Sequence, residues 1–81
     1  MEGKSIFVAG NFRKIKLKVA DVRHFVEDHG GMMCKEITRN TVLAILGSGN
    51  TKNASLAAKM GCPVWEPDDF QQWHENYQVS N

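Results

Sequence analysis

The chain has 81 residues, a formal net charge of +1 and a hydrophobic share of 42%. So short a chain forms one domain, because its buried surface cannot be divided between two cores, and its ordinary composition excludes the disordered and collagen-like classes. No apolar run approaches the roughly 20 residues of a membrane span, and the first residues do not resemble a secretory signal. We therefore expect one domain over residues 1–81, with its core at about residues 3–77, in an intracellular protein without a membrane partner, cytoplasmic in a bacterium or nuclear in a eukaryote.

The first half of the chain predicts two strands separated by a helix. Ser5–Ala9 is a short apolar run that is typical of a strand buried on both faces. Apolar residues recur at helical spacing over residues 19–29, and Gly30 and Gly31 then end this helix. Residues 32–37 are predicted to form the second strand.

The second half repeats the alternation of strand and helix. Residues 42–46 are apolar without interruption, which favours a parallel sheet covered on both faces. After a loop of small polar residues we expect a helix over residues 52–60, a short strand at residues 63–65, and a third helix that opens at Pro67. The alternation predicts an α/β fold with a mainly parallel sheet and helices on both of its faces.

Three aromatic residues of the last helix lie at helical spacing: Phe70, Trp73 and Tyr77. Such a stripe could stack on nucleic-acid bases, but aromatic residues at this spacing usually belong to a core. We expect Phe70 and Trp73 to be buried and Tyr77 to be available to a partner.

The residue types that carry catalysis or bind metals show no suitable spacing. The two cysteines are too few for a disulfide scaffold and lack ligand spacing, so we expect buried free thiols. The histidines share no helical face with a cysteine or carboxylate, and Ser48 lacks the GxSxG context of a nucleophile. We expect no catalytic residue, no metal and no cofactor. The cysteines and histidines concerned are Cys34, Cys62, His24, His29 and His74.

Positive charge is concentrated before residue 60. Residues 1–59 hold all ten lysines and arginines against five acidic residues, whereas residues 60–81 hold four acidic residues and no base. Lys52 follows a loop of Gly, Ser, Asn and Thr at a predicted helix N-terminus, which is a favourable position for an anion, although the GxxxxGK[ST] spacing of nucleotide sites is absent. The plainer interpretation of Lys52 is a solvated lysine at the start of an ordinary capped helix, and that of the preceding basic run is a solvated loop. The loop cations are Arg13, Lys14, Lys16 and Lys18.

The order of landmarks along the chain resembles that of a BRCT domain, from Gly3 to Trp73. The closest similarity is to the branch found in bacterial NAD-dependent DNA ligases and in the large subunit of replication factor C. That branch has the same first strand, Gly-Gly helix stop and lysine-led second helix. The landmarks are Gly3, Lys4, Gly10, Gly30, Gly31, Thr41, Gly47, Lys52, Ala57, Ala58, Gly61, Pro63, Val64 and Phe70.

The resemblance implies a four-stranded parallel sheet in the order 2-1-3-4, flanked by three helices of which two share one face. It also implies a docking module of DNA replication and repair proteins that binds without catalysis, even where the parent chain is an enzyme such as a DNA ligase. Partners in this family are phosphorylated peptides, DNA ends with a 5′-phosphate, or a second BRCT domain.

Phosphate-binding members of the family use a Ser or Thr at the end of the first strand, the following Gly, and a Lys that opens the second helix. Gly10 and Lys52 match these positions, whereas Ala9 replaces the hydroxyl residue. The neighbouring Asn11 offers an amide donor in its place. The ligase-like branch also places an arginine early in the first helix, where this chain has valine and the adjacent Lys18.

Two hypotheses follow from the sequence. In the first, the domain binds a phosphorylated DNA end or the DNA backbone. In the second, which Ala9 favours, it pairs with another BRCT domain or a partner protein without phosphate dependence. The residues assigned to phosphate and DNA in the first hypothesis are Gly10, Asn11, Arg13, Lys14, Lys16, Lys18 and Lys52.

Overall fold

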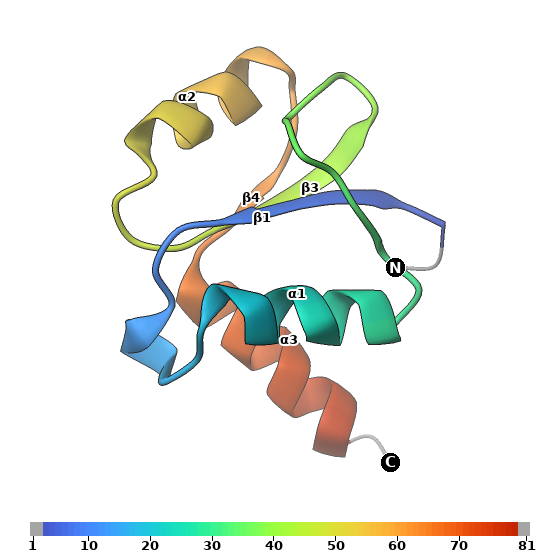
Figure 1. Ribbon diagram of the computed structural model, residues 1–81, viewed down its shortest axis with the longest axis vertical. Helices are drawn as coiled ribbons and strands as arrows, with labels where there is room; N and C mark the ends of the chain where they lie inside the picture. The colour runs from blue at the N-terminus through green and yellow to red at the C-terminus, as the bar shows by residue number, and fades with distance from the viewer. Residues whose placement is uncertain (1–2, 80–81) are drawn as a thin grey trace.

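A computed structural model describes residues 3–79, and for residues 77–79 it describes the backbone alone. Its four strands form one parallel sheet in the order β2-β1-β3-β4, which confirms the predicted α/β fold and strand order (Figure 1). Within the described residues, no helix is long and apolar enough to cross a membrane. The elements in chain order are β1 (Ser5–Ala9), a short 3-10 helix η1 (Arg13–Ile15), α1 (Val19–Asp28), β2 (Met32–Met33), β3 (Thr41–Leu46), α2 (Thr51–Lys59), β4 (Val64–Trp65) and α3 (Pro67–Val79).

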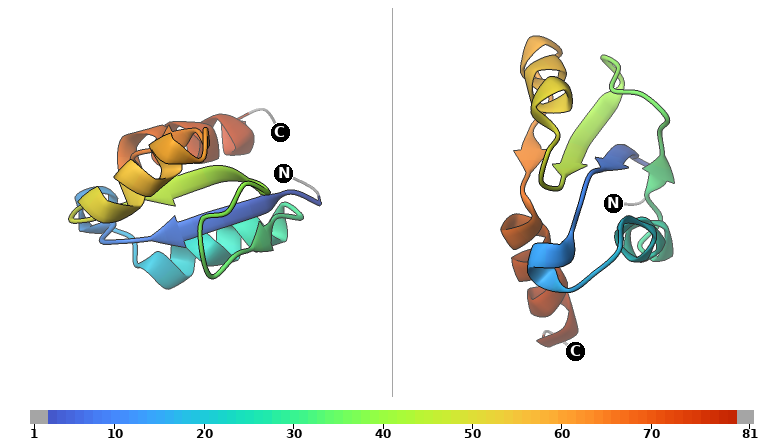
Figure 2. Two further views of the ribbon diagram at one scale, coloured as in Figure 1. Left: turned by 90° about the horizontal axis from the view of Figure 1, so that it is seen from above. Right: turned by 60° about the vertical axis from the view of Figure 1, so that its left-hand side comes forward.

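The sheet separates two layers of helices. Helices α1 and α3 cover one face and α2 covers the other, as the views in Figures 1 and 2 agree. Successive side chains of a strand point to opposite faces, so both faces of the central strands need cover. In β1, Ile6 and Val8 pack beneath α1 and α3, whereas Phe7 packs beneath α2. The structure therefore has the expected arrangement, with two helices on one face of the sheet and one helix on the other.

Phe70 of α3 anchors the larger of the two cores. Its side chain is 0% exposed, and its ring centroid lies 5.7 Å from that of Trp73 and 6.4 Å from that of Phe25 on α1. The prediction for Phe70 is confirmed, but Trp73 is only half-buried, because it lies at the margin of the core beside Trp65. The side chain of Tyr77 lies outside the described residues.

The second strand is shorter than predicted. It ends at Met33, although the amide of Cys34 still donates to the carbonyl of Ile6 at 3.0 Å. Beyond that point the chain forms a coil that places Ile37 in the core beneath α2, at 4% exposure. Ile37, which contributes to the prediction of a strand up to residue 37, is therefore buried although it lies in a coil.

The basic segment after β1 is more ordered than the predicted loop. Its first residues form η1, and the Asn11 carboxamide oxygen accepts a hydrogen bond from the backbone amide of Arg13 at 2.8 Å. Phe12 and Ile15 are buried and fix this turn to the core. The cations of the segment are therefore carried on an anchored turn.

Both cysteines are free thiols, as predicted. Cys62 is buried in the same core cluster as Phe7 and Ala44, and this burial raises the pKa of its thiol. Cys34 is only partly buried, since it follows the short edge strand β2, so the prediction of two buried thiols is correct for Cys62 alone.

Candidate functional site

The carboxyl ends of β1 and β3 form a topological switch point. After β1 the chain leads to α1 on one face of the sheet, and after the neighbouring β3 it leads to α2 on the other face (Figure 1). Ligands of open α/β sheets bind at such points, because the two departing connections leave a crevice outside the strand ends. The predicted residues Gly10, Lys14 and Lys52 all follow these strand ends.

Two glycines bring the connections after β1 and β3 into contact. Gly10 has a φ of +103°, and a Cβ at this residue would meet the Asn50 side chain and lie 2.8 Å from the amide nitrogen of Gly47. A Cβ on Gly47 would in turn lie 2.5 Å from the amide nitrogen of Asn11. Hydrogen bonds from Gly47 N to Ala9 O at 2.8 Å and from Ser48 N to Asn11 O at 3.0 Å complete the contact. This approach holds the loop before α2 in place.

Helix α2 begins without a side-chain cap from its N-cap residue in the described structure. The Asn50 carboxamide oxygen accepts from Asn53 Nδ2 at 2.5 Å instead of from an amide of the first turn. The first amides of a helix have no partner within the helix and carry a partial positive charge. The N-terminus of α2 is therefore suited to an external anion.

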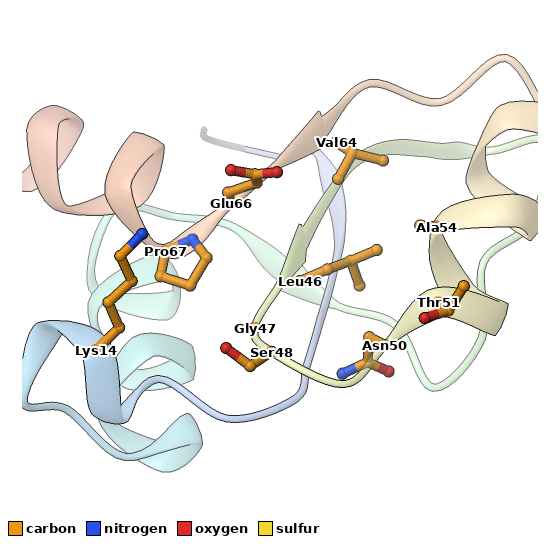
Figure 3. Close-up of a pocket in the computed structure, with 10 residues that line it drawn as sticks. All are labelled: Lys14, Leu46, Gly47, Ser48, Asn50, Thr51, Ala54, Val64, Glu66 and Pro67. Atoms are coloured by element: carbon orange, nitrogen blue, oxygen red, sulfur yellow. The ribbon is translucent and has the colours of Figure 1, made fainter.

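A cavity of about 400 Å³ opens beside this N-terminus (Figure 3). Asn50 and Thr51 lie on one side of it, while Lys14 and Glu66 lie on the other (Figure 3). Its remaining surface is mostly apolar, from the ends of β3 and β4, α2 and the start of α3. The complete lining is Lys14, Leu46, Gly47, Ser48, Asn50, Thr51, Ala54, Val64, Glu66 and Pro67.

Lys14 is paired with an acid of α3. Its ammonium nitrogen lies 2.7 Å from Oδ2 of Asp68, and the two side chains are 61% and 58% exposed. The hydrogen bond and the charge of Asp68 raise the pKa of the Lys14 ammonium, and the charge of Glu66 adds to this effect. Lys14 is therefore positively charged at neutral pH and already neutralised in part by its neighbours.

The structure brings only some of the predicted phosphate residues together. Lys14 lines the cavity, and Gly10 shapes the loop beside it without lining it. Lys52 lies in the first turn of α2 but lines an adjacent groove with Ser55 and Lys59. The oxygen of Asn11 is engaged with the amide of Arg13.

The other three cations lie further along the basic segment. Arg13 begins η1, Lys16 follows it with a φ of +60°, and Lys18 precedes α1, where its amide donates to the Asp21 carboxylate at 3.0 Å. All three are exposed. They are not among the described residues that line the cavity.

Five polar residues at or beside the cavity are not among the predicted phosphate residues: Ser48, Asn50, Thr51, Glu66 and Asp68. The sequence indicates no binding role for the side chain of Ser48, and none for Glu66. Asp68 lies in the first turn of α3, where the helix dipole favours an acid, and its carboxylate also binds Lys14. The unequal charge of the two halves of the chain was a signal for such a contact, but it does not specify the pair.

The described residues include no cluster of three or more His, Cys, Asp or Glu side chains that could hold a metal ion. Comparison with protein-family models and with curated proteins finds no match for this chain.

Proposed function

We propose that the chain is a non-catalytic BRCT-type module of a DNA replication or repair protein, and that it recognises a phosphate group of DNA, such as a phosphorylated 5′ end, at the N-terminus of α2. The observation that carries this proposal is the first turn of α2, which has no side-chain cap from Asn50 and opens beside a cavity at the switch point of the sheet. Oriented backbone amides at a helix N-terminus bind phosphate without a metal or cofactor.

The side chains near this helix N-terminus support the proposal. Ser48 and Thr51 add hydroxyl groups to the cavity surface, and Lys14 adds a cation from the opposite side. Lys52 lies within the same first turn, where its charge is added to that of the helix dipole. A phosphate that bridges these groups would form charge-assisted hydrogen bonds, which are stronger than neutral ones.

The strand order supports assignment to the BRCT family. The resemblance of the sequence implies the order 2-1-3-4 with two helices on one face, and the structure has this arrangement. The landmark glycine at residue 10 has a structural reason, because only a residue without a Cβ fits against Gly47 and Asn50. The part of the proposal that assigns the phosphate to DNA rests on the resemblance to the ligase branch.

Two observations favour the alternative of a protein-interaction module that needs no phosphate. The position for a phosphate-binding hydroxyl at the end of β1 is occupied by Ala9, and Lys14 is already paired with Asp68. A site with fewer donors binds phosphate less strongly, and the surface would then serve a partner protein. The experiment below separates these two functions.

The test compares duplex hairpins with a 5′-phosphate and a 5′-hydroxyl, titrated with the protein at 50 and 200 mM salt. We expect tighter binding of the phosphorylated hairpin and a loss of about 5- to 20-fold for Lys52→Ala, because a charge-assisted contact is removed. Lys59→Ala is the matched control, since it removes a lysine near the other end of the same helix, about 10 Å along its axis. Equal and negligible binding of both hairpins would exclude phosphate recognition and leave the protein-interaction module.

A further inference from the structure

Two acidic residues lie beside the cavity, opposite the N-terminus of α2. Glu66 lines the cavity together with Lys14 (Figure 3). Asp68 holds the Lys14 ammonium at 2.7 Å. Glu66 connects β4 to α3, and Asp68 lies in the first turn of α3. The cavity is therefore bordered by a partial positive charge at α2 and by negative charge at α3.

The contact between Lys14 and Asp68 contributes little to the stability of the fold. Both side chains are more than half exposed, and exposed ion pairs contribute little to stability because water and salt screen them. The pair also spans 54 residues of sequence, so it is not a local helix contact. An ammonium held this weakly is free to exchange its carboxylate for another anion.

We propose, on the basis of the phosphate site above, that Asp68 and Glu66 are specificity-determining residues of that site. Asp68 competes with the ligand for the Lys14 ammonium. Asp68 and Glu66 together repel further negative charge on the α3 side of the cavity. The ligand that fits this polarity carries a single terminal phosphate at α2 and has no second phosphate next to it.

This polarity predicts an unusual order of affinities. A site that is simply basic binds a 5′-triphosphate more tightly than a 5′-monophosphate, because Coulomb attraction grows with ligand charge. Here the additional phosphates would approach Glu66 and Asp68, and repulsion offsets the attraction. Wild-type protein should bind a 5′-monophosphate at least as tightly as a 5′-triphosphate.

The test uses one hairpin sequence with a 5′-hydroxyl, 5′-monophosphate or 5′-triphosphate end, titrated with wild-type protein, Asp68→Asn and Glu66→Gln. Asp68→Asn should tighten monophosphate binding about two- to fivefold, the size expected for an exposed charge contact. Each variant should tighten triphosphate binding by a larger factor than monophosphate binding. In a Lys14→Met background the gain from Asp68→Asn for the monophosphate should shrink, because Asp68 then has no ammonium to occupy.

Glu75→Gln is the matched control for Asp68→Asn, because it removes one charge from the same helix about 10 Å further along. It should change neither the monophosphate nor the triphosphate affinity. The urea midpoint of Asp68→Asn should stay close to that of wild type, because the loss of one charge from the first turn of α3 costs at most about 1 kcal/mol. If wild-type protein binds the phosphorylated hairpin through Lys52 but neither acid variant alters the order of affinities, the role of the acids is wrong and the proposed function stands. If neither wild type nor any variant distinguishes the three ends, both proposals are wrong.

Discussion

At the scale of single residues, Gly10 has the strictest requirement. Its φ of +103° is rarely adopted by residues with a Cβ, and a Cβ would lie 2.8 Å from the amide nitrogen of Gly47. We expect Gly10→Ala to lower the free energy of unfolding by about 2–4 kcal/mol, because backbone strain and a steric clash with another backbone add together. Urea denaturation followed by circular dichroism measures this loss.

Gly49 provides the control for this prediction. It also has a positive φ, of +83°, but a Cβ at this residue would meet nothing within 4 Å. Gly49→Ala should therefore lower the free energy of unfolding through backbone strain alone, by about 1 kcal/mol. An equal loss of stability in the two variants would show that the close approach of Gly10 to Gly47 is not what makes the glycine necessary.

The sequence predicts individual cations of the candidate site better than their partners. Lys52 could be placed at a helix N-terminus because the loop before it and the helix after it are adjacent in the sequence. Lys14 could be identified as one of several loop cations, but its partner Asp68 is 54 residues away. A contact over that separation depends on the turn of η1 and the start of α3, which no local pattern reports.

At the scale of elements, periodicity predicts the elements that have a continuous buried face. Helix α1 and strands β1 and β3 were placed to within one residue, since their apolar residues repeat at the period of the element. Of the short elements, β4 also lies within one residue of its expected range, but β2 ends earlier than expected and η1 lies in a segment expected to be a loop. Strand β2 has two residues and η1 has three, which is too few for any period, and Ile37 contributes to the core from a coil.

Helix α3 depends on one fully buried ring. Phe70 is 0% exposed and contacts aromatic residues of both α1 and α3. Phe70→Ala should lower the free energy of unfolding by about 3–5 kcal/mol, because a cavity remains between the helices and the sheet. Gln71→Ala, at the exposed neighbouring residue, should change it by less than about 0.5 kcal/mol. Thermal and urea unfolding measure both, and similar values for the two variants would contradict this view of the core.

At the scale of the whole molecule, the fold joins two segments of opposite charge. Residues 1–59 carry an excess of five positive charges and residues 60–81 carry four negative charges. The parallel strands end at one edge of the sheet, so the segment after β1 and the start of α3 are brought together there, and Lys14 meets Asp68. The molecule is therefore nearly neutral overall, with a local polarity at the candidate site.

This charge distribution sets the salt dependence that we expect for the proposed binding of DNA. Each phosphate that a cation neutralises contributes about −0.9 to the slope of log K against log salt concentration. Phosphate contacts by Lys14 and Lys52 alone give a slope of roughly −2, far shallower than that of dedicated DNA-binding proteins with many such contacts.

Titrations of the 5′-phosphorylated hairpin between 50 and 300 mM salt measure this slope, and Lys52→Ala should make it shallower by about 1. A slope of roughly −5 or steeper would mean that Arg13, Lys16 and Lys18 also contact the DNA backbone, and the site would then extend along the whole basic segment instead of being confined to the N-terminus of α2.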